Sequence, residues 1–164
     1  MNRQAKTLIE RHGFLDTDRR TPMHDEIQLW AYANLKEIIP VKEGYQIEIL
    51  KKGLDHPISF LTNNDSNRVV VGFVDLRAEG YLNEVISDGT RRVKYLRLAI
   101  EIKSRIDSCG DLIRQINFYR KYTDESTTWF VISPDDRYRR ILWEHGIYFL
   151  KYPKKPERLT LFEG

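Results

Sequence analysis

Cysteine is nearly absent from the chain, which has only Cys109 among its 164 residues. One cysteine excludes a disulfide within a single chain, and it excludes an all-cysteine metal or iron–sulfur site. No apolar run is long enough to span a membrane, and the polar N-terminus shows no secretory signal. We therefore expect a cytoplasmic protein.

Internal repeats, linkers and low-complexity tracts are also absent. This absence predicts one domain over residues 1–164, with an N-terminal arm at 1–20 and a C-terminal tail at 153–164. Hydrophobic residues make up 41% and aromatic residues 12% of the chain, which is enough for a folded core. The net charge of +3 is compatible with a polyanionic partner but does not by itself indicate one.

A very apolar stretch, residues 69–76, predicts a central strand that is covered on both faces. Asp75 interrupts this run near its end. The acid is either the first residue of a turn or a metal ligand. We favour the ligand interpretation, because Leu76, Arg77 and Ala78 can continue the strand.

A second apolar strand ends in an acid and a base. Side chains on a strand alternate between its faces, so Glu101 and Lys103 point the same way. The opposite face is aliphatic, with Leu96, Leu98, Ile100 and Ile102. Ala99 precedes the charged pair on its own face, whereas a solvated strand would carry charge along the whole face.

Two helices flank these strands in the sequence. Thr21 and Pro22 are typical of a helix start, and we expect this helix to run to residue 38. Glu26 lies at the edge of its apolar stripe, where it either favours the helix dipole or points into a site. A second helix is predicted after the capping residue Ser108. In this helix Gln115 and Tyr119 share one face.

The remaining pattern predicts mainly strands. We expect residues 45–50 and 57–61 to form a hairpin at the sheet edge. A second hairpin should span residues 79–94, with its turn at Asp88-Gly89. We expect strands at residues 127–133 and 147–152. A helix should begin at Ser133-Pro134 and end at Gly146.

Basic residues gather on the return limb of the second predicted hairpin, which contains Arg91, Arg92, Lys94 and Arg97. This limb is either a phosphate-contacting rim or ordinary solvated charge. Arg114, on the helix that follows, is a further candidate phosphate contact.

The arrangement resembles the PD-(D/E)xK nuclease superfamily over residues 21–152. The resemblance rests on Glu26, on Asp75 at one strand end, on Glu101-Ile102-Lys103 at the next, and on Gln115-x-x-x-Tyr119. Val74 stands where the signature proline precedes the acid. The resemblance implies an α/β fold with a restriction-endonuclease-like αβββαβ core, in which helices flank a mixed central sheet. A C-terminal helix and strand would be additions to this core.

The same resemblance implies a metal-dependent DNA endonuclease. Asp75 and Glu101 would bind Mg²⁺ or Mn²⁺, and Glu26 would hold a second ion or a water. Lys103 would hold the attacking water or stabilise the charge of the pentacovalent transition state. Gln115 would support the catalytic residues, and Tyr119 would contact DNA.

Two other hypotheses stay open. The chain is alternatively a non-catalytic nucleic-acid-binding or assembly module, although buried charges are costly to retain without a function. It is alternatively the nuclease subunit of a transposition, repair or restriction complex. A nuclease with one site that breaks duplexes is expected to form a homodimer.

Overall fold

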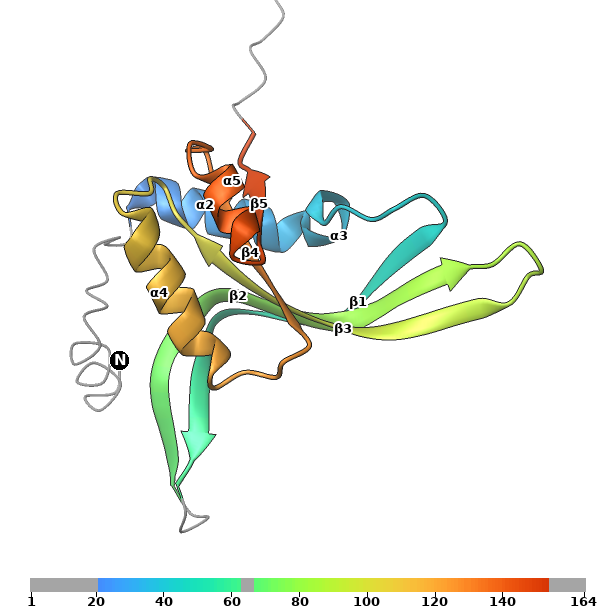
Figure 1. The fold of residues 1–164 in the computed structure, drawn as a ribbon, viewed down its shortest axis with the longest axis horizontal. Coiled ribbons are helices and arrows are strands. Elements are labelled where there is room, and N and C mark those ends of the chain that lie inside the picture. Colours follow the sequence, from blue (N-terminus) through green and yellow to red (C-terminus); the bar gives the residue numbers. More distant parts are fainter. Residues whose placement is uncertain (1–20, 63–66, 154–164) are drawn as a thin grey trace, which may run out of the picture.

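The computed structural model describes residues 21–62 and 67–153. The expected N-terminal arm lies outside the described residues, and so does the expected C-terminal tail apart from residue 153. The chain forms an α/β structure with a five-stranded mixed sheet (Figure 1). In chain order the elements are α2 (Pro22–Ala33), α3 (Leu35–Ile38), β1 (Tyr45–Leu61), β2 (Arg68–Val85), β3 (Arg91–Ile102), α4 (Cys109–Arg120), β4 (Thr127–Ser133), α5 (Arg139–Glu144) and β5 (Ile147–Lys151).

The strands lie in the sheet in chain order, from β1 to β5. β1, β2 and β3 form an antiparallel meander, whereas β3, β4 and β5 are parallel to one another. The parallel pairs need crossovers, which α4 and α5 provide. Each strand therefore pairs with the strand next to it in the sequence.

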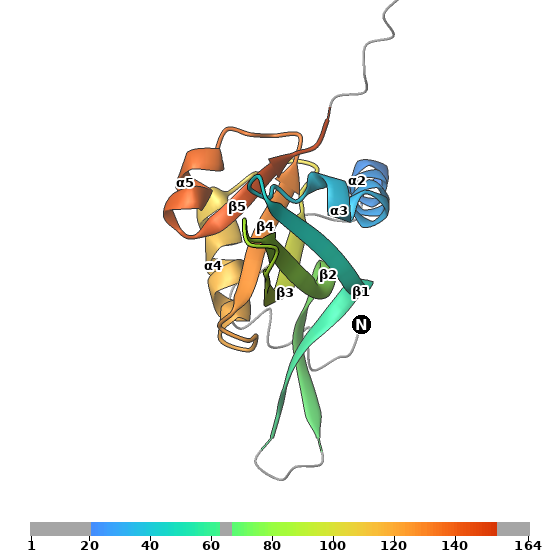
Figure 2. The ribbon, with the colours of Figure 1, turned by 90° about the vertical axis from the view of Figure 1, so that its right-hand side faces the viewer.

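Helices cover the sheet on both faces (Figure 2). On β3, the side chains of Leu98 and Ile100 pack in the same core as α2, while Ala99 between them packs in the core of α4. β4 alternates in the same way. This strict alternation explains why these strands read as apolar on both faces.

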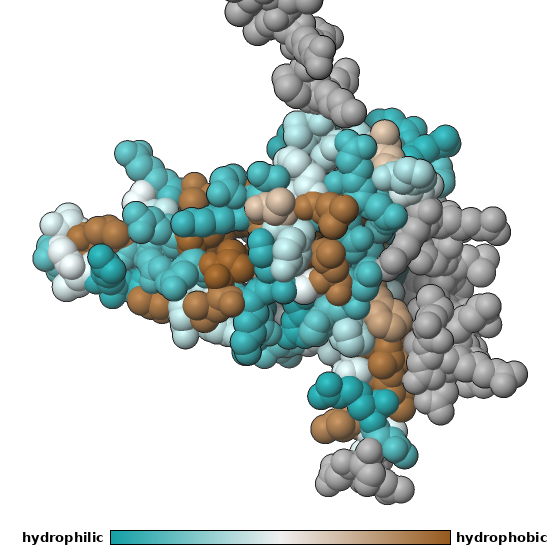
Figure 3. Space-filling view, turned by 180° about the vertical axis from the view of Figure 1, so that it is seen from behind, coloured by the Kyte–Doolittle hydropathy of each residue, from teal (hydrophilic) through white to brown (hydrophobic). Residues whose placement is uncertain are grey.

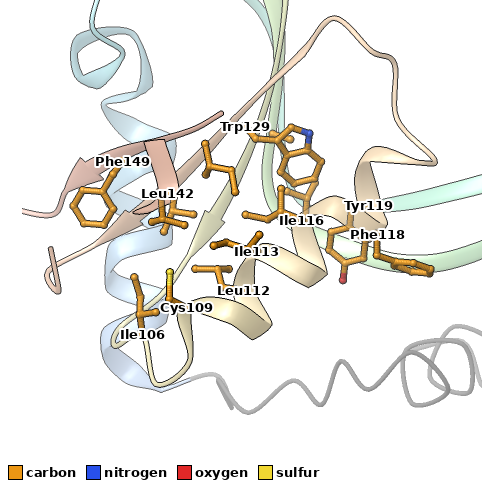
Figure 4. Packing of buried hydrophobic residues seen from close by; sticks show 14 of the residues in the cluster. Ile106, Cys109, Leu112, Ile113, Ile116, Phe118, Tyr119, Trp129, Leu142 and Phe149 are labelled. Carbon is orange, nitrogen blue, oxygen red and sulfur yellow. The ribbon is translucent and has the colours of Figure 1, made fainter. Parts of the chain in front are cut away.

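The α4 core is built by an apolar stripe along the helix. Leu112, Ile113, Ile116 and Tyr119 are all buried, and they pack towards Trp129 on β4 (Figure 4). Each such aliphatic side chain contributes on the order of 2 kcal/mol. The Ser108 hydroxyl accepts a hydrogen bond from the N–H of Asp111, which confirms the predicted cap.

Three predicted elements differ from those observed. The predicted hairpin in residues 45–61 is wrong, because β1 is one long strand that pairs with β2 along its whole length. A register shift between Ile49 and Lys51 accommodates the turn-forming residues that suggested a break. The first helix divides at Asn34, whose side-chain amide donates to the Trp30 carbonyl. The helix predicted from Ser133 begins only at Arg139.

Two antiparallel extensions leave the body of the molecule (Figure 1). The turn between β2 and β3 contains Asp88 and Gly89, as predicted, and Gly89 adopts a φ of +82°. The other extension joins the end of β1 to the start of β2. Within residues 21–62 and 67–153, none of the helices has the length and apolar character needed to cross a lipid bilayer.

Candidate active site

Asp75 and Glu101 lie side by side where β2 and β3 separate. Leu76 pairs with Ile100 in the last step of this ladder, so Asp75 and Glu101 are the next residue on each strand. Asp75 Oδ2 accepts a hydrogen bond from the N–H of Ile102 at 2.7 Å. The Asp75 carboxylate thus takes the place of a backbone carbonyl as the acceptor for Ile102, at the point where β2 and β3 diverge.

Glu101 and Lys103 form a close pair, as their shared strand face predicted. Lys103 Nζ lies 3.9 Å from Glu101 Oε2, and the two side chains are only 13% and 3% exposed. The N–H of Lys103 donates to the Ile132 carbonyl at 2.9 Å, which extends the pairing with β4 by one residue. Buried charges are costly unless they are compensated, so this pair is an exception to ordinary core composition.

Helix α2 contributes two buried polar side chains to the same place. His24 Nε2 lies 3.3 Å from Asp75 Oδ1, and the His24 side chain is 4% exposed. Gln28 Nε2 donates to the Asp75 carbonyl at 2.7 Å and to Asp55 Oδ1 at 3.1 Å. Both ends of the Asp75 residue, its carboxylate and its carbonyl, are therefore held by α2.

The backbone of β1 is irregular at this point. Leu54 pairs with Leu76 and His56 with Val74, which places Asp55 opposite Asp75. Asp55 has a φ of 48°, in the left-handed region that non-glycine residues seldom occupy. Gln28 bridges the two aspartates and stabilises this conformation. Strained backbone of this kind gathers at functional sites.

A polar network continues along β2 from the site. Arg77 lies 3.0 Å from His56 Nε2 and donates to Glu79 Oε1 at 3.0 Å. Burial, and then the Arg77 charge, lower the pKa of His56. The Tyr95 hydroxyl donates to Glu79 Oε2 at 2.7 Å and lowers the pKa of that carboxyl. The arginine therefore lies between a carboxylate and an imidazole that stays neutral at neutral pH.

Glu26 is not brought to this cluster. It is exposed, and its carboxylate accepts a hydrogen bond from the Tyr152 hydroxyl at 2.8 Å. His24 and Gln28 each lie two residues away on α2, so the Glu26 side chain leaves the helix from another face. The structure thus places a histidine and a glutamine of this helix, and not the expected acid, against Asp75.

The two candidates on α4 are paired with each other. Gln115 Nε2 donates to the Tyr119 hydroxyl at 3.3 Å. Tyr119 is 3% exposed, and its ring stacks on Trp129. The structure therefore places Tyr119 in the core between α4 and the sheet, and a DNA contact by this side chain stays a prediction.

The basic candidates divide between two elements. Arg91, Arg92 and Lys94 are exposed on β3, and Arg97 on the same strand donates to Ser126 Oγ at 3.0 Å. Arg114 lies instead on α4, where Asp111 pairs with it.

The donors near Asp75 have the chemistry of a divalent-metal site. Carboxylates suit Mg²⁺ and Mn²⁺, and an imidazole can add a nitrogen ligand. Asp75, Glu101 and His24 are therefore the residues that could hold an ion. In the part of the chain that the structure describes, no group of three or more His, Cys, Asp or Glu side chains is gathered into a ready metal-binding cluster. Backbone carbonyls, water and substrate oxygens would have to supply further ligands.

His24 and Gln28 were missed at the sequence level, although the helical period contained the signal. The buried positions of α2 are His24, Ile27, Gln28 and Ala31. Counting back from Ala31 in steps of three and four reaches both polar residues. Polar side chains inside an apolar stripe are the feature that could have identified them.

Comparisons of the chain with protein-family models, with curated protein sequences and with solved structures gave no match.

Proposed function

We propose that the chain is a metal-dependent DNA endonuclease that hydrolyses phosphodiester bonds. The observation that carries this proposal is the meeting of Asp75, Glu101 and Lys103 at the point where β2 and β3 separate. The order of helix, three antiparallel strands, helix and parallel strand also supports the restriction-endonuclease-like arrangement that the sequence resembles.

Each residue has a role that follows from its surroundings. Asp75 and Glu101 would hold Mg²⁺ or Mn²⁺, with His24 as a further donor, and the ion would supply Lewis-acid activation of the phosphate. Lys103 stabilises the negative charge that develops on the phosphoryl oxygens. Glu101 orients the Lys103 ammonium, and Gln28 fixes the backbone of Asp75.

The test is cleavage of labelled duplex, flap, junction and single-stranded DNA in Mg²⁺, Mn²⁺ or EDTA. We expect cleavage with either ion and none with the chelator, because the charged donors that meet at the site are carboxylates. Glu101→Gln keeps the shape of the side chain and should abolish cleavage. Cleavage that persists in EDTA would exclude the proposal. DNA binding without any cleavage would favour a non-catalytic binding module.

The proposed chemistry also predicts how many copies of the chain act on one DNA. One site cuts one strand, so a chain with one site that makes double-strand breaks should act as a symmetric dimer on DNA. Analytical ultracentrifugation of the protein–DNA complex measures this directly. A complex with one copy that still breaks both strands would contradict the expectation.

A further inference from the structure

The outer half of β3, residues 91–96, is an open edge of the sheet. β2 occupies one side of this segment, but on the other side pairing with β4 begins only at Arg97. No other described strand pairs with this side of residues 91–96. Residues 91–95 are all exposed, and the hairpin extends beyond the helices (Figure 1). In Figure 3 the surface of the same hairpin mixes hydrophilic and hydrophobic side chains.

This edge carries positive charge that is only partly paired within the described part of the chain. Arg91 and Lys94 form no ion pair with any residue in the ranges 21–62 and 67–153. Arg92 is 75% exposed and lies 3.5 Å from Glu84. Arg114, by contrast, is paired with Asp111 on its own helix. The charge of the edge is therefore available to an anionic partner.

Charges on an open edge also prevent aggregation, and that role needs no ligand. Two features of β3 go beyond it. Arg91 and Arg97 lie on the same face of the strand as Glu101, and Arg97, whose guanidinium lies over the Tyr95 ring at 4.7 Å, is paired with Asp124 at 3.6 Å. The same strand then ends at Glu101 and Lys103. One strand thus connects the basic edge to the candidate active site.

The strand sets a distance between these two features. Ten residue steps separate Arg91 from Glu101, which corresponds to about 33 Å at the rise of a β-strand. Successive phosphates on one strand of B-DNA advance about 3.4 Å along the axis, so this distance spans roughly ten base pairs.

Resting on the proposed nuclease function, we infer that the edge at residues 91–96 binds the phosphate backbone of duplex DNA about five to ten base pairs from the cleaved bond. Arg91, Arg92 and Lys94 contact phosphate oxygens, and outward-facing backbone N–H groups of the edge donate to the same oxygens. The substrate is accordingly an extended duplex, and a short duplex cannot reach both the site and the edge.

The experiment compares the double variant Arg91→Gln/Lys94→Gln with the matched double variant Lys121→Gln/Arg139→Gln. All four side chains are exposed, and none has an ion-pair partner among the residues that the structure describes. Binding to labelled duplexes of about 6 to 24 base pairs is measured by fluorescence anisotropy in EDTA, over a series of salt concentrations.

For the parent, affinity should rise with duplex length until the duplex spans both the site and the edge. The edge variant, Arg91→Gln/Lys94→Gln, should lose this gain. The slope of its log binding constant against log salt concentration, measured on the longest duplex, should fall by about 2, because two phosphate contacts are removed. The matched variant should behave as the parent does.

The inference is overturned if both double variants give the same slope and length profile, or if the edge variant binds every length equally less well. It is also overturned if the parent is a dimer and the edge variant is a monomer, since a second copy would then occupy the edge.

The failure of this inference is separable from that of the proposed function. Length-dependent binding without cleavage in Mg²⁺ or Mn²⁺ would reject the nuclease function but retain DNA binding by the edge. Cleavage by a parent whose salt slope equals that of the edge variant would retain the nuclease function and reject DNA binding by the edge.

Discussion

Asp75 is the residue on which three elements converge. Its carboxylate accepts from the Ile102 N–H and lies beside His24, and its carbonyl accepts from Gln28. A side chain held by this many groups has little rotamer freedom left. Preorganisation of this kind is what a charged ligand or reactant requires.

Replacing Gln28 by leucine should therefore destabilise the fold and disturb the site. The Asp75 carbonyl would lose its amide donor, and the cost should be about 1–3 kcal/mol of unfolding free energy. Urea denaturation measures this cost, and calorimetry with Mn²⁺ measures the loss of metal affinity. Gln46→Leu, at an exposed position of β1, is the matched control. Equal stability and equal metal binding in both variants would show that the bridge to Asp75 and Asp55 has no effect.

The contact between β2 and α4 depends on a glycine. A Cβ added at Gly72 would overlap the Tyr119 ring, whereas one added at Gly53, on β1, would meet no atom within 4 Å. A sequence rich in valine predicts a buried strand. Which helix residue lies over the glycine was not predictable, because that depends on the packing of distant segments.

Gly72→Ala should lower the unfolding free energy by about 1–3 kcal/mol, because the helix must shift away from the strand. Gly53→Ala, in the same sheet, should change it much less. Adding Tyr119→Leu to Gly72→Ala should recover part of the loss if the overlap is its cause. Thermal unfolding of the four proteins measures these effects, and equal costs for the two alanine variants would contradict this account.

The stabilising contact of Asp135 with Arg137 and Ile106 should depend on pH. Hydrogen bonds from Arg137 lower the pKa of Asp135 from 3.8 to about 2, and the same carboxylate accepts from the Ile106 N–H at 3.4 Å. Because the pKa is lower in the folded state, the stabilisation is present above about pH 4 and is lost as the pH falls towards 2.

Asp135→Asn should therefore cost about 1 kcal/mol at pH 7, a modest value because solvent around the exposed Arg137 screens the pair. The difference from the parent should shrink as the pH falls through 2 and vanish below it. Urea denaturation at several pH values tests this, with Asp107→Asn in the exposed Arg105 pair as the control. A difference that is the same at every pH would contradict the assignment.

At the level of the whole molecule, the sequence predicted the α/β class, the order of the central strands and the pairing of Glu101 with Lys103. These features depend on the alternation of side chains along single strands, which is a local property. The length of β1 was not predictable in the same way, because pairing with β2 overrides the turn-forming residues at its centre. Which residues of α2 face Asp75, His24 and Gln28 or the expected Glu26, depends on how the helix is rotated about its axis. Only the packed structure defines this rotation.

The central claim is that Asp75 and Glu101 hold an ion while Lys103 acts on the reacting phosphate. Single-turnover cleavage by Lys103→Met, together with its metal affinity measured by calorimetry, tests this claim most directly. Methionine keeps much of the lysine bulk but removes the charge. We predict that the fold, DNA binding and metal binding are retained, with a cleavage rate lower by roughly a hundredfold or more. Cleavage as fast as that of the parent would show that the pair of Glu101 and Lys103 is structural and would contradict the account.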